Sequence, residues 1–250
     1  MDWGRFAAIV AVGLVLVIFT AIFYDARVIA WTETAPSGVR GFFGWVTRFG
    51  KSDWLLIPTG IIAVVVALGD WRRVSRTNAA AWWEIGTFAV VLFVVVAASG
   101  LATDIVKPIV GRFRPDFVPE GAFAFAPFSL GGYSHYSFPS GHATTMAAVA
   151  VIAAFVPSVV TVPIVIATAL VAFSRVMISV HFPSDVVGGA LIGIGVGYFI
   201  LRVMADAGIL FVRRPNGMIR ARFGVLRRLR RRKDGLAGLF PALWTALGRQ

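Results

Sequence analysis

Residues 84–106 read EIGTFAVVLFVVVAASGLATDIV, a strongly apolar segment of the length that an α-helix needs to cross a lipid bilayer. The composition of the whole chain agrees with this segment. Of its 250 residues, 58% are hydrophobic and 14% are charged, whereas an ordinary soluble domain has roughly 45 to 50% and about 25%. With a mean hydropathy of +0.81, the chain is predicted to be a multi-pass membrane protein, which excludes disordered, collagen-like and disulfide-scaffold classes. The chain contains no cysteine, so thiol catalysis and thiolate metal sites are excluded as well.

Other apolar segments lie on both sides of this one, and each predicts a further membrane-spanning helix. The six predicted spans are residues 7–24, 55–69, 84–106, 142–156, 160–179 and 185–205. The expected fold is therefore all-α, a six-helix transmembrane bundle followed by a basic tail. We divide the chain accordingly into a membrane domain, residues 1–206, and a basic cytoplasmic tail, residues 207–250.

Arginine and lysine residues in the loops set the expected orientation, because cytoplasmic loops carry an excess of them. Arg72, Arg73 and Arg76 separate the second and third spans, and ten basic residues with no Asp or Glu lie within residues 213–233. Both termini are therefore expected on the cytoplasmic side of the cell (inner) membrane. The tail is expected to contact anionic lipid head groups and not nucleic acid. The segments expected on the outer or periplasmic face are residues 25–54, 107–141 and 180–184.

One of these outer segments has helical periodicity. Phe42, Trp45, Val46 and Phe49 follow an i, i+3, i+4, i+7 spacing, which is typical of an amphipathic helix. Such a helix either lies on the outer membrane surface or packs within a loop, and the spacing fits both interpretations equally.

The sixth predicted span carries small residues at regular intervals. Gly189, Gly193 and Gly197 recur every four positions, so they lie on one helix face and allow another helix to approach closely. Packing within the chain is the favoured use of this face, and a homodimer contact is the alternative.

Three polar stretches lie at the predicted outer ends of the spans. Charged residues are rare in apolar spans, because a charge near the bilayer centre costs roughly 2.5 to 3.5 kcal/mol on insertion scales. Charged residues that gather at one side of the membrane are therefore candidates for a functional site. In the first stretch, Lys107 and Arg114 are seven residues apart, with Arg112 between them. If the helix continues past Pro108, Lys107 and Arg114 lie on the same helix face. Cations aimed at one point hold an oxyanion such as phosphate, although a span end that snorkels to the surface is the alternative.

The second stretch is Phe138-Pro139-Ser140-Gly141-His142, directly before an apolar helix. Free backbone N–H groups at a helix N-terminus form an anion site, and Gly141 lets a ligand approach the backbone. Ser140 is alternatively a simple N-cap. His142 is placed to exchange a proton beside a bound anion.

The third stretch contains Arg175, then His181, then Asp185 four residues later. A carboxylate within reach of one imidazole nitrogen fixes the tautomer and leaves the other nitrogen as a base or a nucleophile. A capping Asp and an interfacial His explain the pair equally well when it is viewed alone.

Together these stretches resemble the motifs of the type 2 phosphatidic acid phosphatase superfamily, which are K-x6-R-P, then P-S-G-H, then S-R-x5-H-x3-D. The matching segments begin at Lys107, Pro139 and Ser174, and every named position matches. The basic tail lies outside the resemblance.

The resemblance implies a phosphatase that needs no metal and no other cofactor. His181 would attack phosphorus to form a phosphohistidine, Asp185 would orient it, and His142 would protonate the leaving oxygen and then activate water. The family, and not the spacing, decides which histidine attacks. The residues implied in phosphate binding are Lys107, Arg114, Arg175, Ser140 and Gly141.

Four other functions compete with this interpretation. A serine hydrolase built on Ser140 leaves the three cations unexplained. A metal hydrolase is disfavoured because no H-x3-H pair shares a helix face. A lipid or anion transporter would use the cations for binding and the histidines as proton relays, but the fourth and sixth spans are almost wholly apolar below their outer ends. Soluble vanadium haloperoxidases share the site pattern, and the six spans argue against their chemistry.

The predicted location of the site indicates the class of substrate. A site at the outer membrane surface accepts a head group while the lipid tail stays in the bilayer, so the expected substrate is a lipid phosphate or diphosphate. Undecaprenyl diphosphate, phosphatidylglycerophosphate, phosphatidate and lipid A phosphate all remain compatible.

Overall fold

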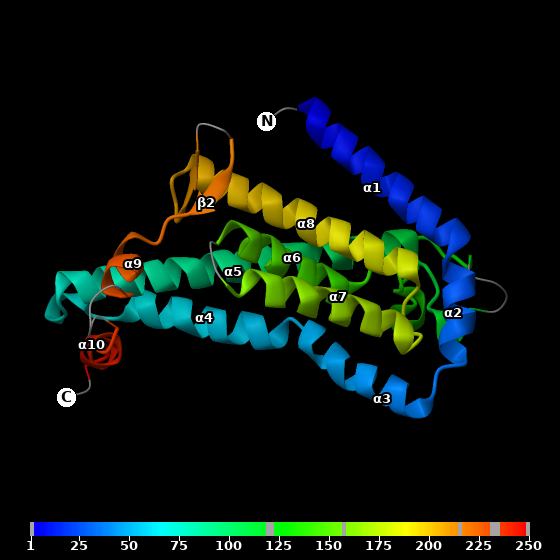
Figure 1. Ribbon diagram of the computed structural model, residues 1–250, viewed down its shortest axis with the longest axis horizontal. Coiled ribbons are helices and arrows are strands. Elements are labelled where there is room, and N and C mark those ends of the chain that lie inside the picture. The colour runs from blue at the N-terminus through cyan, green and yellow to red at the C-terminus, as the bar shows by residue number, and fades with distance from the viewer. Residues whose placement is uncertain (1–2, 119–122, 157–158, 215–216, 231–235, 249–250) are drawn as a thin grey trace. The chain divides into compact units, whose positions relative to one another are not determined.

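The structure is a computed structural model that describes residues 3–118, 123–156, 159–214, 217–230 and 236–248 (Figure 1). Most of the chain is helical. The α-helices are α1 (Trp3–Phe23), α2 (Asp25–Glu33), α3 (Ser37–Val46), α4 (Asp53–Leu68), α5 (Arg76–Val110), α6 (Gly141–Phe155), α7 (Thr161–Met177), α8 (Pro183–Asp206), α9 (Gly224–Arg230) and α10 (Leu239–Ala246). Short 3-10 helices are η1 (Thr47–Gly50), η2 (Trp71–Arg73), η3 (Pro115–Phe117) and η4 (Gly132–His135), and the strands are β1 (Phe211–Arg213) and β2 (Ile219–Ala221).

The chain forms two compact units. The first unit consists of Met1–Ser52, Val96–Ala154 and Ser158–Tyr198. The second unit consists of Asp53–Val95, Phe155–Pro157 and Phe199–Gln250. The long helices α5 and α8 contribute residues to both units, and all the predicted site residues belong to the first.

Several helices are suited to a membrane. Within the described residues, Ser37–Leu68, α5 and α8 are long and apolar enough to cross a bilayer, and α1 with α2 adds a fourth span if this pair, bent by 51°, counts as one. The helices α6 and α7 are apolar but have 15 and 17 residues. A mostly helical membrane fold is therefore confirmed with three or four candidate spans, and the count of six remains a prediction.

Helix α5 is longer than the span predicted from hydropathy. Its 35 residues correspond to about 50 Å at 1.5 Å per residue, whereas the hydrocarbon core of a bilayer is roughly 30 Å thick. Hydropathy detects only the part that lies in lipid. The helix continues past Pro108 but ends at Val110, where Gly111 has a φ of +59°. Lys107 is thus on the last turn of α5 and Arg114 lies beyond it, so the two cations do not share a helix face.

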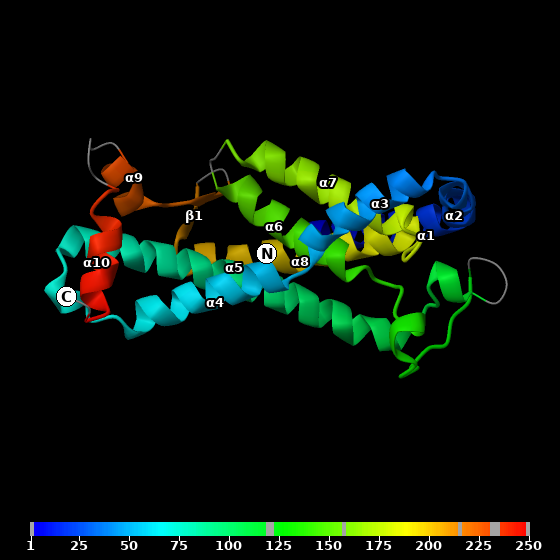
Figure 2. The ribbon, with the colours of Figure 1, turned by 90° about the horizontal axis from the view of Figure 1, so that it is seen from below.

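Helix α3 has features of both structures that its periodicity predicts, a helix packed within the chain and a helix at the membrane surface. It lies beside α7 (Figure 2), and Val46 forms a buried cluster with Met146 of α6 and Val171 of α7. Phe42 and Trp45 remain 54% exposed on the other side of the helix. The helix therefore packs within the first unit and presents an aromatic surface suited to a membrane interface.

The glycines of α8 allow it to approach α6 closely. A Cβ atom on Gly189 would collide with the carbonyl oxygen of Ser140, and a Cβ on Gly193 would collide with that of Thr144. Packing within the chain is thus the observed use of these two positions. The homodimer contact predicted as the alternative has no support in the structure, because α6 already covers them.

The second unit orders part of the basic tail. The carboxylate of Glu84 accepts hydrogen bonds from the N–H groups of Gly224, Val225 and Leu226 at 2.8 to 2.9 Å, and so caps the start of α9. Leu229 of α9 and Leu239 of α10 form a buried cluster with Ala81 of α5. The antiparallel hairpin β1–β2 was not predicted, since its three-residue strands are too short to give a periodic signal.

Candidate active site

Asp185 lies in the first turn of α8 and is fully buried. Its Oδ2 atom accepts hydrogen bonds from the hydroxyl group of Ser137 at 2.6 Å and the N–H group of Phe182 at 2.8 Å. Its Oδ1 atom accepts one from Nη1 of Arg112 at 2.7 Å. Three donors from three segments of the chain therefore hold this carboxylate in one orientation.

Arg112 connects Asp185 to a second buried carboxylate, that of Asp25. Its Nη2 atom lies 2.7 Å from Oδ2 of Asp25, and its guanidinium group stacks 4.1 Å from the ring centroid of Phe182. Asp25 also accepts hydrogen bonds from the N–H and hydroxyl groups of Ser184. The side chains of Arg112, Asp25 and Asp185 are at most 3% exposed. Removing one member of such a buried ion pair typically costs about 3 to 5 kcal/mol.

His181 lies between a carboxylate and a guanidinium. Its Nδ1 atom is 3.5 Å from Oδ2 of Asp185, and its Nε2 atom is 3.5 Å from Nη1 of Arg114. Burial lowers the pKa of His181 to about 4, although the neighbouring Asp185 acts in the opposite direction. The imidazole is therefore neutral near pH 7. Because the carboxylate favours a proton on Nδ1, the lone pair is on Nε2, which faces Arg114.

Arg114 is fixed by backbone carbonyl groups from several loops. It donates to Tyr133 O at 2.7 Å, to Val180 O at 3.0 Å and to Tyr136 O at 3.3 Å. Its guanidinium group also lies 3.9 Å from the ring centroid of Tyr133. These contacts hold the cation beside Nε2 of His181, and among the residues that the structure describes no carboxylate pairs with it and competes with a bound anion.

Arg175, in the last turn of α7, donates from Nη1 to the hydroxyl group of Thr47 at 2.7 Å. Three buried polar atoms on the predicted site residues have no hydrogen-bond partner within the described residues: Nε of Arg175, Oγ of Ser140 and Nδ1 of His181. Buried polar groups without a partner are uncommon in folded proteins. Nδ1 of His181 faces the Asp185 carboxylate at 3.5 Å, so Nε of Arg175 and Oγ of Ser140 are the two atoms that a polar ligand could complete.

Backbone contacts bring the second polar stretch to the third. The N–H group of Ser140 donates to the carbonyl oxygen of Asp185 at 3.0 Å, and helix α6 begins at the next residue, Gly141. A Cβ atom on Gly141 would lie 3.6 Å from Nζ of Lys107, so this ammonium group lies beside the helix N-terminus. Lys107 also forms an ion pair with Asp104 at 2.8 Å.

His142 follows in the first turn of α6 and packs against η1. A Cβ atom on Gly50 would lie 2.6 Å from Cδ2 of His142, so the imidazole rests directly on this glycine. In the described part of the chain, neither His142 nor Lys107 has a direct hydrogen bond to His181, Asp185 or Arg114. The structure therefore joins His181, Asp185 and Arg114 directly and links Ser140 to them through its backbone.

Sequence reasoning missed three residues of this site and underrated a fourth. Asp25, Ser137 and Ser184 were not predicted, and Arg112 was noted between Lys107 and Arg114 without a part in catalysis or phosphate binding. Asp25 had a usable signal, because it directly follows the first apolar span on the predicted outer side. The two serines had none, since single serines near a span end are common. No group of three His, Asp or Glu side chains is placed to hold a metal ion among the residues described.

Comparison with known proteins identifies the family of this chain. The sequence matches the PAP2 superfamily over residues 88–209. It is 34% identical to the lipid A 1-phosphatase of Rhizobium johnstonii over 217 residues, which cover 85% of this chain and 86% of that protein. It is 32% identical to the lipid A 1-phosphatase of Rhizobium etli, with 85% and 91% covered.

A solved structure shares the fold. The crystal structure of a transmembrane PAP2-type phosphatidylglycerolphosphate phosphatase from Bacillus subtilis aligns with a TM-score of 0.55 and 22% identity. The alignment covers 80% of this chain and 96% of that one. At this level of identity, the likeness concerns the fold alone.

Proposed function

Because this chain belongs to the PAP2 superfamily and is a lipid phosphatase, we propose that it removes a phosphate group from a lipid through a phosphohistidine formed on His181. One observation carries the proposal. The buried imidazole of His181 is held between the Asp185 carboxylate and the Arg114 guanidinium, with a distance of 3.5 Å on either side. A neutral imidazole in this position directs a nucleophilic lone pair toward the place where a cation holds a phosphoryl group.

In the first step, Nε2 of His181 attacks phosphorus, and the bond between phosphorus and the lipid oxygen breaks. The negative charge of the bound phosphate group favours the protonated form of His142, and this proton goes to the departing oxygen, so the lipid leaves as an alcohol. Asp185 offsets the positive charge that develops on the ring of His181. The phosphoryl group is then bonded to Nε2.

In the second step, His142 takes a proton from a water molecule as the water oxygen attacks phosphorus. The nitrogen–phosphorus bond breaks, inorganic phosphate leaves, and His181 returns to its neutral form. Negative charge on the phosphoryl oxygens is offset in both steps by fixed donors, which is how most phosphoryl-transfer enzymes lower the barrier. The proposed donors are Lys107, Arg114, Arg175, the Ser140 hydroxyl and the Gly141 N–H group.

Lipid A 1-phosphate, or a lipid with a similarly placed phosphate, is the proposed substrate. The two lipid A 1-phosphatases of Rhizobium align over 85% of this chain and over 86% and 91% of their own lengths. These relatives are named for hydrolysis, which favours the enzyme over the transport alternative. We further propose that the six apolar helices span the inner membrane with both termini in the cytoplasm, so that the site faces the outer or periplasmic side.

Substrate choice is tested with purified protein in detergent that contains EDTA. Phosphate release is compared for lipid A, undecaprenyl diphosphate, phosphatidylglycerophosphate, phosphatidate and a water-soluble sugar phosphate. The proposal predicts the highest kcat/KM on lipid A, release of the 1-phosphate, and loss of release in His181→Ala. A clear preference for another lipid would replace the proposed substrate, and equal turnover of the sugar phosphate would contradict a lipid phosphatase.

A further inference from the structure

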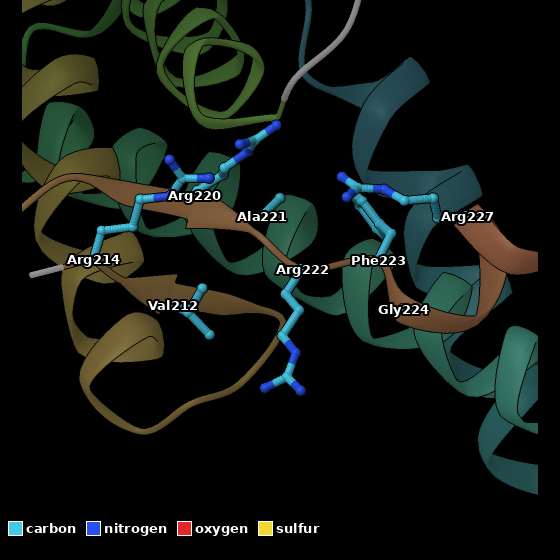
Figure 3. Close-up of a pocket in the computed structure, with 8 residues that line it drawn as sticks. All are labelled: Val212, Arg214, Arg220, Ala221, Arg222, Phe223, Gly224 and Arg227. Carbon is cyan, nitrogen blue, oxygen red and sulfur yellow. The ribbon is translucent and has the colours of Figure 1, made fainter.

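The basic residues of the tail have no part in the reaction above, but several of them gather around a pocket. This open pocket of about 320 Å³ lies wholly within the second unit (Figure 3). Its lining combines four arginines with an apolar floor: Val212, Arg214, Arg220, Ala221, Arg222, Phe223, Gly224 and Arg227.

The segment that carries these arginines is held in place. Phe211 of β1 and Ile219 and Ala221 of β2 are at most 4% exposed, and strand pairing sets Val212 opposite Arg220. Phe223, which follows the hairpin, packs edge-on against Phe88 of α5 with 5.6 Å between ring centroids. The cations are thus presented by a packed hairpin and not by a loose chain.

No side chain among the described residues neutralises the positive charge in the pocket. None of the four lining arginines has a hydrogen bond or ion pair from its guanidinium group to another residue in the part of the chain that the structure describes. The carboxylate of Glu84 approaches this region, but it already accepts three N–H groups of α9. Figure 3 shows Arg214 and Arg220 extending to one side of the hairpin, Arg227 pointing back toward it from α9, and Arg222 extending to the opposite side.

We propose that this pocket binds a phosphate-bearing anion between Arg214, Arg220 and Arg227. Guanidinium groups present paired N–H donors that match phosphate oxygens, and three of them converging here supply a charge that only an anion offsets. The source of the phosphate is either a phospholipid head group or a soluble phosphate.

The position of the hairpin in the second unit suits a membrane surface. Arg213 of β1 lies 3.7 Å from the carboxylate of Asp206, the last residue of the apolar helix α8. The hairpin is thereby tied to the end of a candidate membrane span, where anionic lipid head groups attract basic side chains.

Binding is measured on the full-length protein in neutral-detergent micelles by isothermal titration calorimetry. One arm uses dioleoylphosphatidylglycerol, a phosphodiester without a terminal phosphate, with dioleoylphosphatidylcholine as the neutral control. The other arm uses inorganic phosphate. The test variant is R214Q/R220Q/R227Q, and the matched variant R72Q/R73Q/R76Q removes three arginines from the same unit but outside the pocket.

Each arginine near an anionic surface contributes about fivefold to affinity, so the pocket triple variant is expected to bind phosphatidylglycerol at least about tenfold more weakly. The matched variant should stay within twofold of the parent protein, because Arg72 and Arg73 already pair with Asp70 and its three arginines do not line the pocket. The single variant R220Q should lose about fivefold, which provides a result that does not depend on the folding of the triple variant. The same pattern with inorganic phosphate would assign a soluble source. Equal losses of affinity in both triple variants would show that binding depends on overall charge and not on the pocket. Unchanged affinity of the pocket variant for both phosphatidylglycerol and phosphate would show that the pocket binds neither. Each of these results would overturn the proposal.

Discussion

Arg112 joins two carboxylates, those of Asp25 and Asp185, in a region from which water is excluded. Nη1 of Arg112 lies 2.7 Å from Asp185, and Asp185 faces His181, so Arg112 can act on the reaction through these two residues. Groups that orient a reactive side chain in this way typically contribute about 10- to 100-fold. Arg112 and Asp25 are therefore expected to act as positioning residues.

Substitution Arg112→Gln is predicted to lower kcat by about 10- to 100-fold with little change in KM, and to lower the free energy of unfolding by about 3 to 5 kcal/mol. Both carboxylates would then be buried without their cation. Steady-state kinetics and thermal unfolding in detergent measure the two effects. The double variant Asp25→Asn/Arg112→Gln should lose less stability than the sum of the single variants, and strict additivity would contradict the ion-pair account.

The protonation of His181 gives a prediction on pH. An unperturbed histidine has a pKa of about 6.5, whereas burial lowers the pKa of His181 to about 4. Between these values the unfolded chain binds a proton that the folded protein does not, so stability should fall as the pH drops from about 6.5 to about 4. The 15N NMR signals of the histidine side chains, with His181 assigned by His181→Gln, should show a neutral ring at pH 5.5. An imidazolium at that pH would contradict the burial argument.

At the residue scale, the sequence was sufficient where side-chain type and spacing both carry meaning. His181, Asp185 and Arg114 were predicted together, and the structure brings them into contact. Asp25 was missed because its partner, Arg112, lies 87 positions away in the sequence. Spacing along a chain does not reveal a pairing of that kind.

At the scale of elements, the contact between α6 and α8 sets the geometry of the site, because the carbonyl oxygen of Asp185 accepts the N–H group of Ser140. Gly189 faces the backbone of Ser140 across this contact, whereas Gly195 on the same helix has no atom within 4 Å of a Cβ. The two glycines therefore form a matched pair for mutation.

Gly189→Ala is predicted to destabilise the protein by about 1 to 3 kcal/mol, the usual cost of overpacking, and to lower kcat by moving Ser140 relative to Asp185. Gly195→Ala should leave kcat unchanged and raise stability by up to about 1 kcal/mol, since alanine favours a helix. Thermal unfolding and phosphate release measure both variants. Equal behaviour of the two would show that close packing at Gly189 does not position the site.

Element boundaries were less predictable than element existence. Each predicted span contains helix, yet α5 extends from Arg76 to Val110 because backbone hydrogen bonding continues beyond the apolar segment. The break at Gly111 depends on a close approach to the carbonyl oxygen of Ala126, which leaves no room for a Cβ atom. Such a tertiary contact has no trace in local hydropathy.

At the scale of the whole molecule, the proposed orientation can be tested directly because the chain has no cysteine. Ser129→Cys lies in the segment expected outside, and Ser75→Cys lies in the loop expected in the cytoplasm. A membrane-impermeant maleimide applied to intact spheroplasts should label Ser129→Cys at once and Ser75→Cys only after lysis. The reverse pattern would place the active site on the cytoplasmic side, and labelling of both before lysis would show leaky cells, which a cytoplasmic marker protein detects.

The central claim is a covalent phosphohistidine on His181, and trapping this intermediate tests it most directly. A substrate with a good leaving group needs little help from His142 in the first transfer, whereas water attack still needs His142 as a base. In the variant His142→Ala, the phosphoenzyme should therefore accumulate. After rapid quenching with a 32P-labelled substrate, mass spectrometry is expected to find an acid-labile, alkali-stable phosphate on His181, and none in His142→Ala/His181→Ala. Label on another residue, or turnover in which no phosphoenzyme forms, would contradict the account.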